Sequence, residues 1–95
     1  MTIIVRLYGA LKDVAGREVL ALEPKNHSLI LIDLIKEILR IHPPLNEFIT
    51  IRDERIEVKG LTILVNGRHV MFLGGDTAVV NDGDVVDILP PLHGG

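Results

Sequence analysis

A single amphipathic helix set among short apolar segments constrains the fold of this chain more than any other feature. Residues 29–41 carry apolar side chains at helical spacing, and their charged residues fall mostly on the opposite face. Asp33 lies near the positive N-terminal end of this helix and Arg40 near its negative C-terminal end, as the helix dipole prefers. Ser28 is the expected N-cap, with a helix start two or three residues later as the alternative. The two prolines in residues 42–44 are expected to end the helix. One such helix needs one sheet to pack against.

Short apolar segments on both sides of the helix predict the strands of that sheet. The first two strands lie so close together in the sequence that an antiparallel pair is the simplest arrangement. Asn66-Gly67 is a strong turn signal between two later strands. The last strand is apolar on both faces apart from Asp87, so we expect it to lie centrally. The predicted strands comprise residues 2–8, 17–23, 61–65, 68–72, 78–80 and 85–89.

Residues 45–60 are harder to interpret from the sequence. Two short alternating segments flank the charged cluster 52–55, which favours a small hairpin with a solvated tip over an irregular loop. The complete pattern predicts an α+β protein, in which a mixed sheet packs on one main helix as a β-grasp domain. We expect this domain to span residues 1–89 and an extended tail to span residues 90–95.

Composition limits the classes of function. The 95 residues contain no cysteine, which removes disulfides, thiolate metal sites and a cysteine nucleophile, and which fits a cytoplasmic location. The net charge of −3 argues against a nucleic-acid partner. We also expect no membrane partner, because no apolar stretch approaches the length of a membrane span.

No side-chain pattern predicts a catalytic site. The four histidines, His27, His42, His69 and His93, are scattered without metal-ligand spacing, so we expect no metal. Gly74-Gly75-Asp76 lacks the spacing and the following lysine of a phosphate-binding loop and reads as a turn. We therefore expect no bound cofactor, and no nucleophile-elbow pattern is present either.

The ending Pro90-Pro91-Leu92-His93-Gly94-Gly95 is the distinctive motif of the chain. Proline cannot continue a strand, so the last strand should stop here and the chain should leave in an extended form. Glycine has no Cβ, so Gly94 and Gly95 can enter a channel that would exclude other residues. We interpret the α-carboxylate of Gly95 as the working chemical group. A frayed end without function is the alternative.

Several of these segments resemble the MoaD-like sulfur carriers, the small subunits of molybdopterin synthase within the ubiquitin-like superfamily. The resemblance covers nearly the whole chain, and the Pro-Pro-x-x-Gly-Gly ending is its most specific part. The length of residues 46–60 is more typical of archaeal-type members, some of which are called ubiquitin-like small modifiers. The motifs that carry the resemblance are residues 3–8, 15–17, 65–68, 82–86 and 90–95.

The resemblance implies a function for the terminus. An E1-like enzyme would use ATP to adenylate the carboxylate of Gly95, and a sulfur donor would convert it into a thiocarboxylate. The chain would then be the small, non-catalytic subunit that delivers sulfur to a pterin precursor in the large subunit of molybdopterin synthase, for a molybdenum or tungsten cofactor. ATP would be consumed by the activating enzyme. Gly94 would keep the tail slender, and Leu92, His93, Phe72 and Leu89 are expected to contact partners.

Two alternatives remain open from the sequence. The chain is either joined through Gly95 to lysines of substrate proteins as a ubiquitin-like modifier, with a role in tRNA thiolation as a further variant, or it is an ordinary β-grasp interaction module with an incidental ending.

Overall fold

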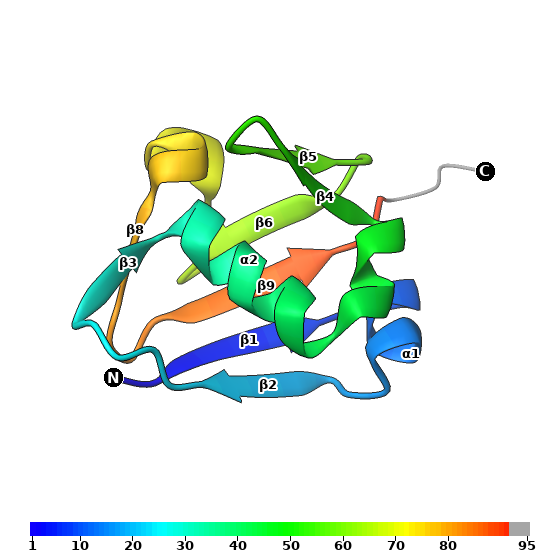
Figure 1. Cartoon of the computed structure of the whole chain (residues 1–95), viewed down its shortest axis with the longest axis horizontal. Helices are drawn as coiled ribbons and strands as arrows, with labels where there is room; N and C mark the ends of the chain where they lie inside the picture. Colours follow the sequence, from blue (N-terminus) through cyan, green and yellow to red (C-terminus); the bar gives the residue numbers. More distant parts are fainter. Residues whose placement is uncertain (92–95) are drawn as a thin grey trace.

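The fold is a five-stranded mixed sheet with one long helix across one face (Figure 1). It is seen in a computed structural model that describes residues 1–91. Two short two-stranded ladders, β3-β8 and β4-β5, complete the architecture. The elements are β1 (Ile3–Leu7), α1 (Ala10–Ala15), β2 (Val19–Leu22), β3 (Ser28–Ile30), α2 (Leu31–Ile41), the 3₁₀ helix η1 (Pro43–Glu47), β4 (Ile49–Arg52), β5 (Arg55–Val58), β6 (Thr62–Val65), β7 (Arg68–His69), the 3₁₀ helices η2 (Val70–Phe72) and η3 (Gly75–Thr77), β8 (Val79–Asn81) and β9 (Val85–Leu89).

Strand β9 lies at the centre of the sheet, as its apolar sequence predicts. The strand order is β2-β1-β9-β6-β7, in which β9 is parallel to β1 and antiparallel to β6. The predicted antiparallel pairing of the first two strands is also confirmed, with Val5 opposite Leu20. The α+β architecture, one main helix on a mixed sheet, therefore agrees with the β-grasp prediction.

The core lies between this sheet and helix α2. Alternate residues of β1, beginning with Ile3, are buried against the helix, and so are Val86 and Ile88 of β9. The apolar stripe of α2 packs against these strand residues and is itself buried. Each large aliphatic side chain removed from water in this way contributes about 1.5–3 kcal/mol. The fully buried helix residues are Leu34, Ile35 and Ile38, with Leu31 and Ile32 nearly so.

The helix begins at Leu31, two residues after the first predicted position and in agreement with the alternative start. Residues 28–30 form β3 and pair with β8, so that Leu29 lies opposite Val80. Ser28 is therefore in a strand and does not cap the helix. The first helical N–H group, that of Leu31, donates instead to the carbonyl oxygen of Ala78 at 2.8 Å. A tertiary contact with Ala78, the residue before β8, has replaced the local cap.

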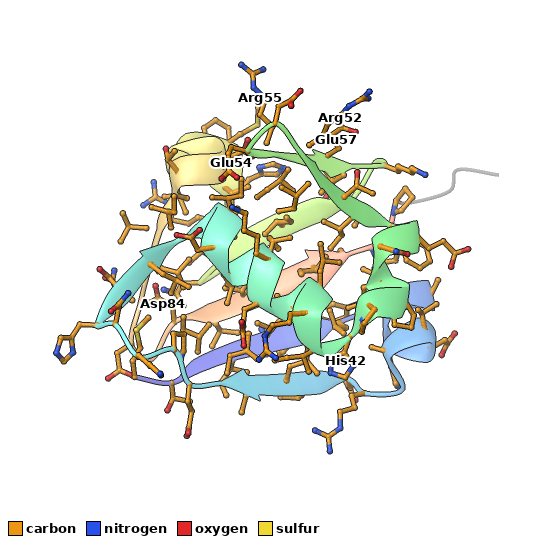
Figure 2. The ribbon with its side chains drawn as sticks, viewed as in Figure 1. His42, Arg52, Glu54, Arg55, Glu57 and Asp84 are labelled. Carbon is orange, nitrogen blue, oxygen red and sulfur yellow. The ribbon has the colours of Figure 1, made fainter. Side chains whose placement is uncertain are left out.

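The hairpin predicted within residues 45–60 is confirmed as β4-β5, and it follows the 3₁₀ helix η1. Its charged tip is exposed, and Figure 2 shows Arg52, Glu54 and Arg55 there. Asp53 and Glu54 both have a positive φ, which a tight two-residue turn requires. The amine of Lys36 in α2 contacts both carboxylate oxygens of Glu54, at 2.7 and 2.9 Å, and ties the hairpin to the helix.

The return strand predicted over residues 68–72 is shorter in the structure. Only Arg68–His69 pair with β6, and residues 70–72 then turn into η2. The Nδ1 atom of His69 accepts a hydrogen bond from the N–H of Met71 at 3.1 Å, which caps this turn. Within residues 1–91, no helix is long and apolar enough to cross a membrane.

Candidate functional site

The last described residues leave the sheet at a narrow exit formed by two glycines. Strand β9 ends at Leu89, as the two prolines predict, and Pro90 and Pro91 follow half-buried. A Cβ placed on Gly9 would lie 2.9 Å from Cγ of Pro90, and one placed on Gly60 would lie 3.3 Å from Cβ of Pro91. Both glycines also have positive φ angles, +57° and +76°. The rings of Pro90 and Pro91 therefore pack directly against the backbone of Gly9 and Gly60, and a side chain at either glycine would collide with them.

The face of the sheet that points away from α2 borders this exit. Its central residues come from β1, β9 and β6, and they share the side opposite the core because strand side chains alternate. The register places Arg6 beside Asp87, and Asp87 beside Leu64. We call this surface the outer face; it consists of Ile4, Arg6, Tyr8, Val19, Ala21, Thr62, Leu64, Val85, Asp87 and Leu89.

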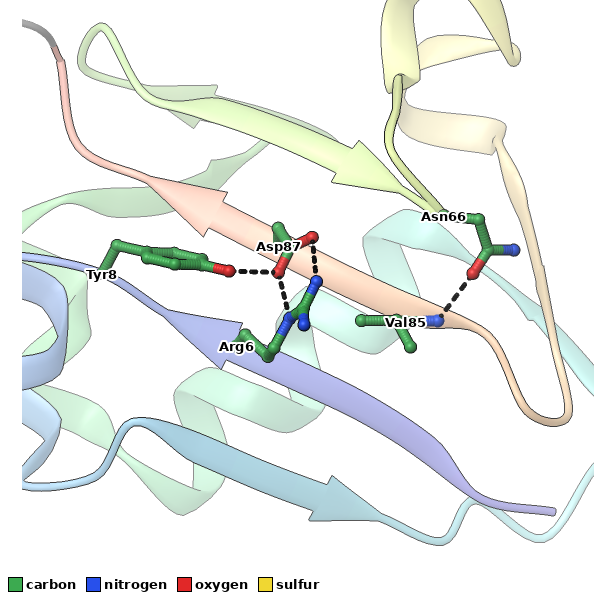
Figure 3. Close-up of polar contacts among 5 residues, drawn as sticks. All are labelled: Arg6, Tyr8, Asn66, Val85 and Asp87. Atoms are coloured by element: carbon green, nitrogen blue, oxygen red, sulfur yellow. Dashed lines mark hydrogen bonds and ion pairs between the residues drawn. The ribbon is translucent and has the colours of Figure 1, made fainter.

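A hydrogen-bonded ion pair lies in the middle of the outer face (Figure 3). The guanidinium of Arg6 donates from Nε to Oδ1 of Asp87 at 2.6 Å and from Nη2 to Oδ2 at 2.9 Å. The hydroxyl of Tyr8 donates to the same Oδ1 atom at 2.9 Å. Asp87 is 7% exposed, whereas about half of the Arg6 side chain is accessible. The buried carboxylate is thus fully engaged, and the cation remains available on the surface.

The ion pair shifts the titration of its members. The hydrogen bond from Arg6 lowers the pKa of the Asp87 carboxyl, the bond from Tyr8 acts in the same direction, and burial opposes both. The hydrogen bond to Asp87 in turn raises the pKa of the Tyr8 hydroxyl. Asp87 therefore stays ionised and Tyr8 neutral around neutral pH.

The opposite end of β9 is fixed by a polar turn. The side-chain oxygen of Asn66 accepts a hydrogen bond from the N–H of Val85 at 2.9 Å (Figure 3). The amide nitrogen of Asn66 donates to Asp84 at the same distance. Asn66 has a φ of 50°, in agreement with the predicted turn at Asn66-Gly67. The central strand is therefore held in register at its start.

The residues predicted to contact partners fall in different places. Leu89 is half-buried on the outer face, directly before the exit. Phe72 is 75% exposed in η2 and packs edge-on against His69, with ring centroids 6.4 Å apart. In Figure 1 the 3₁₀ segments η2 and η3, in yellow, lie at the opposite end of the molecule from the exit. The structure therefore brings Leu89 to the exit and leaves Phe72 at a distance from it.

The four terminal residues on which the sequence argument rests lie outside the described residues. These are Leu92, His93, Gly94 and Gly95. Within residues 1–91 no group of three histidine or acidic side chains could hold a metal ion. The arrangement that the structure does describe is a rigid exit next to a mostly apolar sheet face with one exposed guanidinium, which suits contact with another protein.

Comparison with known proteins places this chain in a family. The model of the ThiS family matches residues 5–95, nearly the whole length. The chain belongs to the ThiS family. The resemblance to MoaD-like carriers of the ubiquitin-like superfamily, inferred from the sequence motifs, is thereby confirmed at the level of the family.

Individual relatives of this ThiS-family chain include archaeal proteins. Small archaeal modifier protein 3 from Haloferax volcanii is 43% identical over 35 residues, which span 37% of this chain and 38% of the relative. Small archaeal modifier protein 1 from Methanosarcina acetivorans has a structure with a TM-score of 0.79 and 27% identity, covering 99% of this chain and 96% of that one. A putative molybdopterin converting factor, subunit 1, from Pyrococcus furiosus has a TM-score of 0.75 and 28% identity, covering 97% and 99%.

Proposed function

We propose that this ThiS-family protein is a sulfur carrier whose Gly95 carboxylate is converted into a thiocarboxylate for molybdopterin biosynthesis. The observation that carries the proposal is the extent of the family match, which runs through residue 95 and so includes the diglycine. The similarity to the putative subunit 1 of a molybdopterin converting factor over 97% of this chain supports the pathway. The proposal takes Gly95 as the last residue of the working protein.

The chemistry follows from the poor reactivity of a carboxylate. An oxygen of the Gly95 carboxylate attacks the α-phosphorus of ATP and releases pyrophosphate, which gives an acyl-adenylate. A sulfide-level sulfur then attacks the acyl carbon and displaces AMP, leaving a thiocarboxylate. The catalytic groups belong to an E1-like enzyme, and this chain supplies the acyl group on a slender end that lacks Cβ atoms.

The described structure supports a role in presenting that end to partners. The exit at Gly9 and Gly60 contacts the rings of Pro90 and Pro91, the first two residues of the tail. The outer face offers apolar side chains and the exposed guanidinium of Arg6 beside the exit. We propose that the E1-like enzyme, and then the large subunit of molybdopterin synthase, bind this face with Leu89 at its border.

A reconstituted reaction tests the proposal. The purified chain is incubated with an E1-like enzyme from the same cell, ATP and sulfide, and its intact mass is measured. We expect a species in which one terminal oxygen is replaced by sulfur, and no such species after Gly95 is deleted. Gly83→Ala is a control at a glycine remote from the terminus: nothing lies within 4 Å of an added Cβ, and its φ of +85° makes the change cost stability but not sulfur transfer. Adenylate formation without any sulfur product would contradict the carrier role.

A second candidate function is protein modification, and the similarity to two small archaeal modifier proteins favours it. In this case the activated Gly95 would be joined to the amine of a lysine on a substrate protein. Tryptic digestion of total protein from the native cell would then show lysines that carry the terminal residues of this chain. Their absence, together with a terminal thiocarboxylate on the free chain, would exclude modification as the main role.

A further inference from the structure

A groove of about 440 Å³ lies between the edge strand β2 and helix α2. It lies apart from the exit and shares only Ala21 with the outer face, because its helical wall is on the core side of the sheet. Among its lining residues three are acidic and one is a lysine. The lining residues are Ala21, Leu22, Glu23, Pro24, Lys25, Leu29, Asp33, Glu37 and Ile41.

The strand that borders this groove has an open edge. Within residues 1–91, β2 pairs with β1 alone. The carbonyl oxygen of Glu18 accepts a hydrogen bond from the N–H of Leu7 at 2.8 Å, so the backbone N–H and C=O groups of Glu18 point toward β1. Bonded and non-bonded pairs alternate along an antiparallel ladder, and therefore Val19 and Ala21 direct their N–H and C=O groups outward. Both residues are exposed. Such an edge is a template for a further strand.

The spacing of the groove wall suits an extended chain. Asp33, Glu37 and Ile41 follow one another at four-residue intervals along α2. Four helical residues rise by roughly 6 Å, and side chains on one face of a strand repeat every 6.6 Å or so, at about 3.3 Å per residue. A strand added to β2 would therefore place alternate side chains near successive members of this row.

The charge of the groove selects the kind of chain that fits it. Glu23 and Asp33 are exposed, and neither forms an ion pair within the described part of the chain. Glu37 is paired with Arg40, whose guanidinium donates to it at 2.6 and 3.1 Å. These two carboxylates are thus unpaired within the described residues, and Lys25 also lines the groove. A second copy of this chain, with its own carboxylates and a net charge of −3, is a poor match for this surface.

We propose that the groove binds an extended, basic segment of a partner protein, which adds to β2 as an extra strand. Its backbone pairs with the outward groups of Val19 and Ala21. Its alternate Lys or Arg side chains contact Glu23 and Asp33, and an apolar residue covers Ile41, which is 42% exposed. This interaction does not depend on Gly95, so it can be tested whether or not the sulfur-carrier function is correct.

An NMR titration of the full chain tests the proposal. The probe is the synthetic peptide Leu-Thr-Lys-Val-Lys-Thr-Leu, which carries its basic side chains on one face of a strand. We expect saturable shifts of the amide signals of Val19, Ala21 and Asp33. The peptide with Glu in place of Lys should bind at least tenfold more weakly, as should one with Pro in place of Val. Shifts confined to other surfaces, or equal shifts with the acidic peptide, would overturn the proposal.

Variants of the protein separate the backbone and charge contributions. Ala21→Pro removes an outward N–H group without removing a bond to β1, and should abolish binding while the protein stays folded. Glu23→Gln with Asp33→Asn should weaken binding about three- to tenfold. Glu47→Gln with Glu57→Gln changes the net charge equally away from the groove and should leave binding unchanged. If both double variants behave alike, or if β2 signals shift with protein concentration in the absence of peptide, the basic segment is not the occupant.

Discussion

Replacement of Gly9 by alanine should disturb the exit of the chain in a way that can be measured by stability alone. Gly9 has a φ of 57° and a ψ of −131°, a conformation that residues with a side chain rarely adopt. The added Cβ would also lie 2.9 Å from Cγ of Pro90, well inside the optimal separation of about 3.5–4.0 Å between carbon atoms. Strain and overlap should therefore both lower the free energy of unfolding.

The two contributions can be estimated separately. A residue held in a sparsely populated backbone conformation costs about 1–3 kcal/mol. Overpacking by one carbon atom costs roughly another 1–3 kcal/mol. Gly16 provides a control without overlap: it lies in the left-handed region, with φ 73° and ψ 11°, and nothing lies within 4 Å of an added Cβ. Gly16→Ala should cost only about 1–2 kcal/mol, the penalty of the left-handed conformation.

Thermal unfolding of four variants tests this estimate. A difference of 1 kcal/mol shifts the melting temperature of a domain of this size by roughly 4–8 °C, so Gly9→Ala should melt clearly below Gly16→Ala. Pro90→Ala removes the ring atoms that the new Cβ would meet, at 2.9 and 3.8 Å. In the double variant the overlap should disappear and the strain remain, giving a coupling energy of about 1–3 kcal/mol. No coupling between positions 9 and 90 would refute the described exit.

Three further outcomes are expected. Asp87→Asn should lower the free energy of unfolding by about 1.5–3 kcal/mol at pH 7. The hydrogen bond from Arg6 lowers the folded-state pKa of Asp87, so this stabilisation is complete above about pH 4 and is lost as the pH falls through the lowered pKa. A difference in stability between wild type and variant that persists in acid would contradict the assignment. Deletion of Gly95 should abolish adenylation by an E1-like enzyme but leave the melting curve unchanged, since the last buried side chain of the described chain is Ile88. A large drop in melting temperature would show that Gly95 has a structural role. Leu89→Arg should weaken binding of that enzyme in a titration more than Phe72→Arg does, because only Leu89 borders the exit; the reverse order would move the interface to η2.

The sequence predicts the architecture because local and global signals agree along most of the chain. The alternation in residues 2–8, the helical stripe of 29–41 and the turn at Asn66-Gly67 each correspond to an observed element. Of the two helix starts that the sequence allows, the later one is correct: Ser28 has the chemistry of a local cap, but residues 28–30 gain a strand partner in β8. The segment 68–72 was predicted as a strand from its apolar residues, but a hydrogen bond to His69 ends the strand early. The first difference comes from a long-range strand pairing that no local pattern contains, and the second from a local side-chain hydrogen bond that replaces strand pairing.

The candidate site could be predicted in part. Its terminal residues form a recognisable motif, and a single acidic residue in an apolar strand, Asp87, indicates a buried or half-buried carboxylate that needs a partner. The partners of Asp87 could not be assigned, because Arg6 and Tyr8 are about 80 residues away and meet it only through the parallel register of β1 and β9. The role of Gly9 and Gly60 was also missed, since a glycine that accommodates a distant proline has no local pattern.

Mass analysis of the last peptide of the chain tests the central claim most directly. The protein is isolated from its native cell under conditions that protect thioacids, digested, and examined by mass spectrometry together with the product of an in vitro reaction with an E1-like enzyme, ATP and sulfide. The account predicts a peptide that ends at Gly95 with sulfur in place of one carboxylate oxygen. A peptide that continues beyond Gly95, or an unmodified carboxylate in both samples, would contradict it.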